Sequence, residues 1–337
     1  MVNSKLMGDV GGSGDVGSIL VRSPRLTVGS LLDALYSARF HALLLLSLLL
    51  TCIATFRTFG FDLDETIESY PDVAGGWGLW SWLADQGLGF SSFFFTVNFI
   101  LALTISVLAF PAAKEGHSKY RVVQIAILLY MTCWFLFGQT RYGSAVGLVV
   151  CAMGCESLPI ALVLCALAVL THKAMAGGIL LFFLWRALRH AKQGLLVAGL
   201  ISGVLTYAVS RGASMLLELS GYANYVNWEL LPSARTPYKY LYMGLLLVAF
   251  LLRAKSDEGK RIAKEMLILT LLLFPFSLYL AFAGRSYQLY AVALLTFLTH
   301  RSIPFVLRYL ILAVYFFDLY MLVFRSGCFA ASGCPAP

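Results

Sequence analysis

Four basic side chains interrupt otherwise apolar stretches of the sequence and are the first candidates for chemistry. Arg141 opens the small-residue run "RYGSAVG", and Arg285 lies in "AGRSYQLY". His172 and Lys173 stand side by side in "LTHKAMAGG". The first turn of a helix already favours an anion through its free N–H groups and its dipole, so a cation placed there is unfavourable unless it shares a bound anion.

We expect Arg141, Lys173 and Arg285 at or near such helix starts, all facing the same compartment. Each of them singly could instead reach toward lipid headgroups. Together, and with His172 beside them, they predict a site for phosphate or pyrophosphate.

Two polar segments, residues 58–91 and 214–236, carry side chains suited to binding sugars. Aromatic planes stack on the C–H faces of sugar rings, while carboxylates and guanidinium groups bind hydroxyls. The aromatic residues could equally form an interfacial belt at the membrane surface. The candidate substrate-binding residues in these segments are Asp62, Asp64, Glu65, Tyr222, Tyr225 and Arg235.

Sequence motifs of the common soluble enzymes are absent from the chain. It contains no P-loop, no GxGxxG after a strand, no GxSxG and no HExxH. The run "DLDE" at 62–65 has the form of a metal-binding D-x-D of nucleotide-sugar transferases. It is expected on the outer side of the membrane, where nucleotide sugars are normally absent. We therefore predict no metal site.

The composition indicates a membrane protein. Of the 337 residues, 60% are hydrophobic and 12% are charged, whereas about a quarter of the residues of a soluble domain are charged. The net charge of +8 comes from basic residues scattered between apolar runs, so no nucleic-acid partner is expected. The predicted fold class is an all-α polytopic membrane protein.

Apolar runs predict about 11 transmembrane helices. Three consecutive runs, 142–155, 158–171 and 174–188, are too short to cross a hydrocarbon core of roughly 30 Å. Such short, broken helices suggest the walls of an outward-facing cavity. The other runs are 42–57, 92–112, 122–138, 194–213, 237–252, 265–283, 286–299 and 303–324.

The distribution of Lys and Arg orients the chain. With the N-terminus in the cytoplasm, most of the 25 basic residues fall on the inner side, as the positive-inside rule requires. The predicted parts are a cytoplasmic tail at 1–38, a multi-pass domain at 39–325 and an outer tail at 326–337. The outer face then receives His172 and five basic residues near helix ends, namely Arg141, Lys173, Arg211, Lys239 and Arg285.

Two of the seven cysteines lie outside the apolar runs. Cys328 and Cys334 stand in the tail "RSGCFAASGCPAP" and could form a disulfide if the tail faces an oxidising compartment. The other five are expected to be small buried hydrophobic residues.

The order of motifs resembles a known enzyme family. The acidic segment ends in "GGWGLWSWLADQGLGFSSFF", and "GQTRYGSAVGLVV", "LTHKAMAGGILLF", "GYANY" and "GRSYQLY" follow in that order. This pattern is similar to the EpsG-like branch of bacterial polysaccharide polymerases, related to the Wzy O-antigen polymerases. The chain differs from the family where Ala174 and Met175 follow "HK" in place of His-x-Ser-Ala.

The resemblance implies a GT-C-like enzyme of the bacterial inner membrane, with its N-terminus cytoplasmic and its C-terminus periplasmic. Such an enzyme joins oligosaccharide repeat units carried on undecaprenyl pyrophosphate at the periplasmic face. Its partners are that lipid-linked oligosaccharide and membrane lipids, together with a chain-length regulator and a flippase. No metal and no other cofactor is expected.

The resemblance also implies roles for the basic residues. Arg141 and Arg285 would neutralise the pyrophosphate leaving group, assisted by Lys173 or Arg211. His172 would act as general base toward the acceptor hydroxyl or would hydrogen-bond a phosphate. Asp62, Asp64 and Glu65 are competing candidates for the base, and Tyr142 and Tyr287 are further candidates for binding substrate.

Two other kinds of function remain open at the level of sequence. One is another enzyme of lipid-linked sugars, either an O-antigen ligase or a GT-C transferase that adds a single sugar. The other is a flippase or transporter for lipid-linked oligosaccharides, for which we find no internal repeat. Asp318, an acid inside the last apolar run, either pairs with an outer arginine or marks a proton path.

Overall fold

The computed structural model describes residues 38–56, 86–87, 89–109, 121–137, 139–172, 175–219, 233, 235–300 and 302–321. These residues form helices and the connections between them, which confirms the predicted all-α fold for this part of the chain. Several predictions concern residues outside it: most of the N-terminal tail and of the loop at 58–91, most of the loop at 214–236, and the C-terminal tail with Cys328 and Cys334. The candidates that also lie outside are Asp62, Asp64, Glu65, Lys173, Tyr222 and Tyr225.

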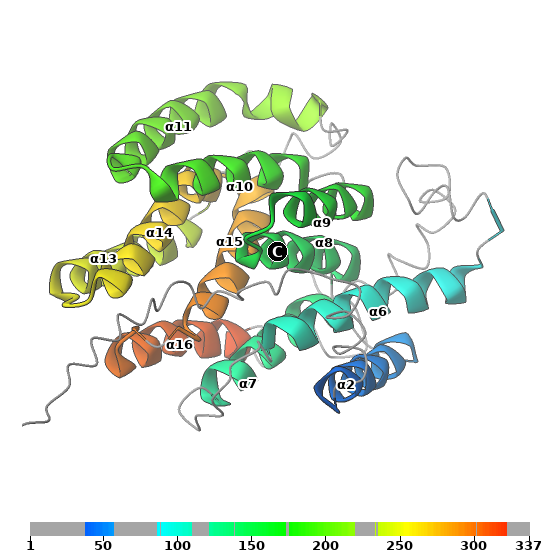
Figure 1. Ribbon diagram of the computed structural model, residues 1–337. Helices are drawn as coiled ribbons and strands as arrows, with labels where there is room; N and C mark the ends of the chain where they lie inside the picture. The colour runs from blue at the N-terminus through cyan, green and yellow to red at the C-terminus, as the bar shows by residue number, and fades with distance from the viewer. Residues whose placement is uncertain are drawn as a thin grey trace, which may run out of the picture.

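Eleven α-helices occur in the described residues (Figure 1). The first six are α2 (Ala38–Thr55), α6 (Phe90–Ala109), α7 (Arg121–Met131), α8 (Thr140–Gly154), α9 (Leu158–Thr171) and α10 (Met175–His190). The other five are α11 (Gly194–Leu219), α13 (Thr236–Arg253), α14 (Asp257–Leu273), α15 (Leu280–Phe297) and α16 (Phe305–Tyr320). A π-helical turn, η2 (Thr132–Leu136), extends α7, and a 3-10 turn, η4 (Phe274–Ser277), follows α14.

Each predicted apolar run corresponds to one of these helices, but three boundaries were predicted wrongly. Helix α11 continues to Leu219, into the segment predicted as an outer loop. Helix α14 begins at Asp257, because Ser256 caps it by accepting a hydrogen bond from the Gly259 N–H at 3.1 Å. The run at 265–283 is divided by the turn η4, where proline interrupts the α-helical hydrogen bonds, so α15 begins at Leu280.

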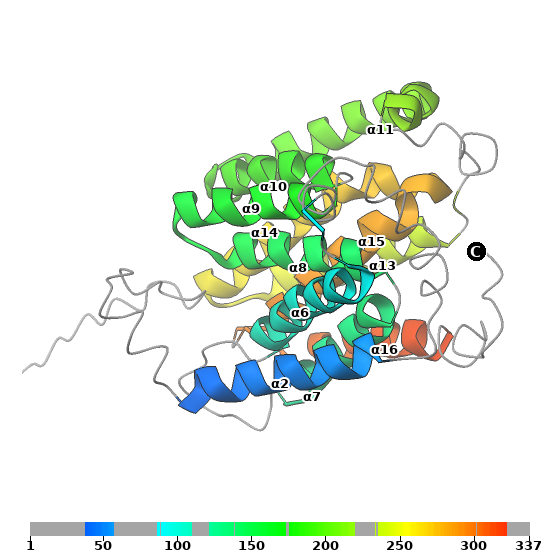
Figure 2. The same cartoon turned by 90° about the vertical axis from the view of Figure 1, so that its right-hand side faces the viewer.

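Most helices pack side by side in one row, each against the next (Figure 2). Contacts join α2 to α6, α6 to α8, α8 to α9, α9 to α10 and α10 to α11. Helices α14 and α15 lie behind the middle of this row, where α14 contacts α10, α11 and α13, and α15 contacts α7 and α8. Helix α16 completes the arrangement by contacting α7 and α13.

Helices α6 and α8 approach each other closely, which the small residues of "RYGSAVG" allow. A Cβ atom at Gly147 would lie 2.7 Å from Cβ of Thr104, so only glycine fits there. Near the start of α8, the Ser144 hydroxyl donates to the Val97 carbonyl at 3.2 Å. This contact sets the position of the first turns of α8 relative to α6.

Apolar side chains also cover the outside of the helices. Leu45, Leu200 and Leu245 are 70%, 65% and 70% exposed. Two helical stretches, Phe90–Ala109 and Gly194–Gly212, are by length and composition sufficient to cross a membrane, and the second is only 22% buried. Three shorter apolar helices accompany them: His41–Thr55, Arg121–Leu136 and Leu158–Thr171.

Candidate functional site

Tyr142 joins three helices at one end of the structure. Its side chain, 6% exposed, stands in the first turn of α8, and its hydroxyl donates a hydrogen bond to the backbone carbonyl of Arg285 in α15 at 2.6 Å. Its ring meets the imidazole of His172 edge to face, with 5.4 Å between the ring centroids. Positions 142, 172 and 285 therefore come together, although long stretches of sequence separate them.

The backbone holds His172 in a tight connection between two helices. Its N–H donates to the Ala168 carbonyl at 2.9 Å, which ends α9, and its own carbonyl accepts from the Met175 N–H at 2.9 Å, which begins α10. The residue itself has an extended conformation. The partly exposed imidazole thereby packs against Tyr142 in the first turn of α8.

The two arginines predicted for catalysis both lie at this end, in different settings. Arg141 is the second residue of α8, as predicted, and its partly exposed side chain forms no hydrogen bond or ion pair with another described residue. Arg285 was expected at or near the start of its helix but is the sixth residue of α15, because that helix begins at Leu280. Its partly exposed side chain therefore lies beyond the first turn, where the helix dipole acts less strongly.

Beside this group lies a partly buried ion pair. Nζ of Lys239, in the first turn of α13, is 2.6 Å from Oδ1 of Asp318 and 4.5 Å from the centre of the Tyr287 ring. The Tyr287 hydroxyl donates to Oδ2 of the same carboxylate at 2.7 Å. Of the two alternatives for Asp318, pairing with an outer arginine is wrong, because the partner is Lys239. The sequence places Lys239 near the start of one apolar helix and Asp318 near the end of another, but several other basic residues also stand at helix ends.

Four further tyrosines form a buried cluster that reaches Tyr287, and they were not predicted. Tyr130, Tyr240, Tyr290 and Tyr315 are each at most 1% exposed. Tyr240 stacks on Tyr290 with 4.7 Å between centroids, and Tyr130 meets Tyr315 at 5.5 Å. Within the described residues, the hydroxyls of Tyr130 and Tyr315 have no hydrogen-bond partner. Buried hydroxyls of this kind usually bind water or a polar group of a ligand.

Tyr142 and Tyr287 were predicted to bind substrate, and their hydroxyls are occupied within the protein. One bonds to the Arg285 carbonyl and the other to Asp318. Each side chain is only 6% exposed. In this conformation, therefore, both tyrosines fix the positions of neighbouring residues.

Two predicted substrate-binding arginines, Arg211 and Arg235, are exposed near the ends of their helices. Arg211 is exposed on α11, with its guanidinium carbon 5.9 Å from the centre of the Tyr207 ring on the same helix. Arg235 is exposed immediately before α13. No contact between described residues connects either of them to Tyr142.

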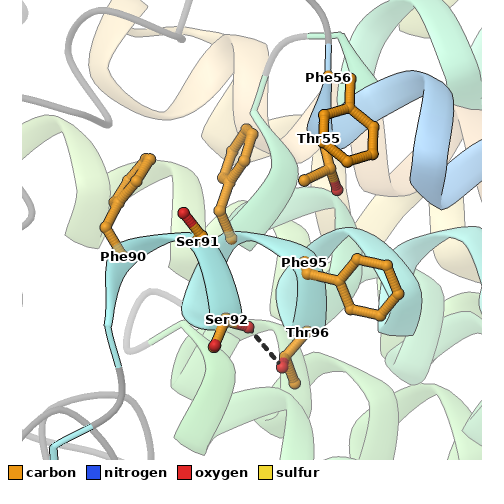
Figure 3. A pocket seen from close by; sticks show the side chains of 8 residues that line it. Thr55, Phe56, Phe90, Ser91, Ser92, Phe95 and Thr96 are labelled. Carbon is orange, nitrogen blue, oxygen red and sulfur yellow. Dashed lines mark hydrogen bonds between the residues drawn. The ribbon is translucent and has the colours of Figure 1, made fainter.

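A pocket of about 490 Å³ opens between the end of α2 and the start of α6 (Figure 3). Its walls are mainly aromatic, with Phe90 stacked on Phe94 at 5.4 Å, and Phe56 and Phe95 complete them. Serine and threonine hydroxyls supply the polar part of the lining. The pocket lies at the same end as Tyr142, because Ser144 early in α8 bonds to Val97 early in α6, but it does not include the arginines.

Among the described residues, no group of three His, Cys, Asp or Glu side chains could hold a metal ion. The acidic residues at 62–65 lie outside that part of the chain.

No known family, curated protein or solved structure matches this chain in the comparisons. Any functional assignment therefore depends on the motifs of the sequence and on the geometry around Tyr142.

Proposed function

We propose that the chain is a multi-pass glycosyltransferase of the bacterial inner membrane. It lengthens a glycan carried on undecaprenyl pyrophosphate by transferring it to a lipid-linked repeat unit at the periplasmic face. The observation that carries the proposal is the meeting of His172 and Arg285 at Tyr142, with Arg141 as the adjoining residue. A proton-accepting group close to two chain positions that carry arginines suits a reaction with a pyrophosphate leaving group.

The placement in a membrane is supported by the helices themselves. Their outer surfaces carry large exposed apolar side chains, and contact of so large an apolar area with water is unfavourable. Helices α8, α9 and α10 have 15, 14 and 16 residues, shorter than a helix that spans a bilayer unaided. They are neighbours in the row of helices, and the turn between α9 and α10 carries His172.

The proposed reaction needs one bond to form and one to break. The acceptor hydroxyl of the incoming repeat unit attacks the anomeric carbon of the growing chain, and the bond from that carbon to the pyrophosphate oxygen breaks. The pyrophosphate leaves with the bonding electron pair, and Arg141 and Arg285 stabilise the charge that develops on it. The proton of the acceptor hydroxyl passes to the imidazole of His172.

Neighbouring residues would hold this arrangement in place. The hydrogen bond from Tyr142 fixes the backbone at Arg285, and its ring supports the imidazole of His172. The ion pair between Lys239 and Asp318 anchors α13 to α16 beside Tyr287 on the same helix as Arg285. The aromatic pocket between α2 and α6 offers an apolar surface to the polyprenyl chain.

The test is an assay of the purified full-length protein with a repeat unit linked to undecaprenyl pyrophosphate, followed on a gel. The wild type should produce a ladder of lengthening glycans. Arg141→Ala and Arg285→Ala should each abolish long products and leave the single unit. Arg253→Ala is the matched control, since Arg253 is an exposed arginine at the far end of α13 and should leave the ladder intact.

Variants of His172 separate its two possible roles. If the imidazole takes the proton, His172→Asn should slow elongation by about a hundredfold or more, and the residual rate should lack the acidic limb of the pH–rate profile. If it only hydrogen-bonds a phosphate, the asparagine should retain most of the activity. Normal ladders from both arginine variants would disprove the pyrophosphate site, and transfer only to a non-repeat acceptor would identify a ligase.

A further inference from the structure

A second pocket lies at the opposite end of the same helices from Tyr142. It has a volume of about 320 Å³ and is enclosed by the ends of α8 and α10 and by the second turn onward of α14. Its charged lining consists of Glu156, Arg186, Arg189, Arg261 and Glu265, with His190 beside them. The short helices α8 and α10 thus line a pocket, but this one is at the far end from His172.

One of the arginines has a structural role. Arg186 donates from Nη1 to the Cys155 carbonyl at 2.9 Å and from Nη2 to the Glu156 carbonyl at 2.7 Å. These carbonyls follow the last turn of α8, where a helix leaves acceptors unsatisfied. Arg186 therefore ties α10 to the end of α8 and closes one side of the pocket.

The other two arginines retain donors for a ligand. Arg189 is held by two contacts: its guanidinium carbon lies 4.8 Å from the centre of the Trp185 ring, and its Nε donates to Nε2 of His190 at 2.9 Å. Neither contact uses its two terminal nitrogens, which remain available to a ligand. Arg261 forms no hydrogen bond or ion pair within the described residues. Burial and the neighbouring arginines, Arg189 first, lower the pKa of His190, which keeps its ring neutral and able to accept that bond.

A buried carboxylate faces the same space. Glu265 is only 3% exposed and lines the pocket, yet its carboxylate has no hydrogen bond or ion pair with any side chain in the described part of the chain. Its backbone carbonyl accepts a hydrogen bond from Nε1 of Trp185 at 2.9 Å, which fixes this turn of α14 against α10. Arg189, Arg261 and Lys264 act on this carboxylate only through Coulomb interactions without a direct hydrogen bond, so a donor that reaches it would stabilise its charge.

We propose that this pocket binds a phosphate ester that carries a free hydroxyl group, such as the headgroup of phosphatidylglycerol. The terminal nitrogens of Arg189 and the guanidinium of Arg261 bind the phosphate oxygens. The hydroxyl donates to the carboxylate of Glu265. The guanidinium groups of Arg189 and Arg261 and the carboxylate of Glu265 together carry a single net positive charge, which balances the single negative charge of a phosphodiester.

The surroundings of the pocket favour a membrane lipid as the source of this phosphate. Helices α8 and α10 end at this pocket, and α14 begins there. In the membrane orientation proposed above, this position is at the level of the headgroups on the cytoplasmic side. Basic pockets between helices on that side are suited to anionic lipid headgroups. A soluble phosphate ester such as glycerol 3-phosphate has the same chemistry and is the other source.

Native mass spectrometry of the full-length protein, purified from mixed vesicles of phosphatidylglycerol and phosphatidylcholine, tests the proposal. The wild type should retain phosphatidylglycerol preferentially. The double variant Arg189→Ala/Arg261→Ala should lose that preference by at least about tenfold, because two charge-assisted contacts are removed. Arg253→Ala, an exposed arginine at the same end but outside the pocket, should retain it.

Further binding experiments identify the source of the phosphate and the role of the Glu265 carboxylate. Glu265→Met should still bind phosphate but lose discrimination between phosphatidylglycerol and phosphatidic acid, which lacks the headgroup hydroxyl. Glycerol 3-phosphate that displaces the retained lipid would identify the soluble ester as a competing occupant of the same site, in support of the shared chemistry. Equal lipid retention by the wild type and the double variant, with no binding of glycerol 3-phosphate, would overturn the proposal. Because the readout is binding, it is independent of the polymerase assay.

Discussion

The hydroxyl of Tyr142 donates a hydrogen bond of 2.6 Å to the backbone carbonyl of Arg285, 143 positions further along the chain. The bond crosses from the first turn of α8 to the second turn of α15, and the same tyrosine ring rests against His172. A backbone carbonyl in the first turns of a helix is already used within that helix, so a second donor at this position holds the two helices in one register. The proposed cation and base thus depend on one side chain for their relative position.

Tyr142→Phe isolates this hydrogen bond. The variant retains the ring contact with His172 and removes only the donor to the Arg285 carbonyl. We expect a loss of stability of about 1 kcal/mol, typical of a single hydrogen bond, and a decrease in the rate of elongation larger than this loss would explain. Thermal unfolding in detergent and initial rates in the ladder assay measure the two effects.

Ser144→Ala is the matched control for that variant, because it removes another hydrogen bond to a backbone carbonyl, that of Val97, two residues further along α8. It should lower stability by a similar amount and leave elongation nearly unchanged. Equal rates for Tyr142→Phe and the wild type would show that Tyr142 has only a packing role.

The ion pair between Lys239 and Asp318 should respond asymmetrically to substitution. The Asp318 side chain is 6% exposed and that of Lys239 is 31% exposed. Lys239→Met leaves a buried carboxylate without its cation and should cost roughly 3–5 kcal/mol, as for other broken buried pairs. Asp318→Asn should cost less, because the lysine can turn toward solvent and the amide can still accept from Tyr287.

A double-mutant cycle measures the coupling in this pair. Lys239→Met/Asp318→Asn should recover part of the stability lost by Lys239→Met alone, since no buried charge then remains. Thermal unfolding of all four proteins in the same detergent provides the comparison. Strict additivity of the two single effects would show that the residues are not coupled.

Close packing of α6 on α8 predicts that Gly147→Ala is destabilising. The new methyl group would overlap the Thr104 side chain, whose Cβ lies 2.7 Å from the required position. Overpacking of this kind typically costs about 1–3 kcal/mol. Since α8 carries Arg141 and Tyr142, elongation should decrease as well. The unfolding midpoint and the ladder assay measure the two consequences.

Gly203→Ala in α11 is the control for this substitution. Nothing lies within 4 Å of a Cβ atom at Gly203, and alanine is the better helix former. The variant should be as stable as the wild type or slightly more stable. If Gly147→Ala were equally stable, the close approach of α6 to α8 would be incorrect.

The two ends of α13 should lie on opposite sides of the membrane. Arg235 precedes this 18-residue helix and Arg253 ends it, and both are exposed. In a variant without native cysteines, Arg235→Cys should react with a membrane-impermeant maleimide in spheroplasts. Arg253→Cys should react only after permeabilisation. Labelling of both positions from the same side would show that α13 does not span the membrane.

Local patterns in the sequence were sufficient to predict the helices and much of the candidate site's location. Each apolar run corresponds to a helix because burial of apolar residues and backbone hydrogen bonding are both satisfied locally in a helix. Helix boundaries were predicted wrongly where hydropathy was the only basis for them. The polar first two turns of α14, from Asp257, depend on the cap provided by Ser256 and not on apolar residues.

The candidate site could be predicted only in part. Polar residues in apolar runs are conspicuous, so Arg141, His172, Arg285 and Asp318 were recognisable without a structure. Their partners were not. Lys239 was one of several basic residues at helix ends, and nothing local to the sequence distinguished it as the partner of Asp318. The pocket formed by Arg189, Arg261 and Glu265 was likewise hidden, because its walls come from three helices.

The sequence by itself thus determined the helical fold class and the residue types available for chemistry, because both follow from neighbours along the chain. Only the tertiary structure decided which of these residues meet. The contact of Tyr142 with His172 and its hydrogen bond to Arg285 depend on how α8, α9 and α15 pack. That packing is set by the shapes of side chains across helix interfaces, such as Gly147 against Thr104, and no periodicity along the chain records it.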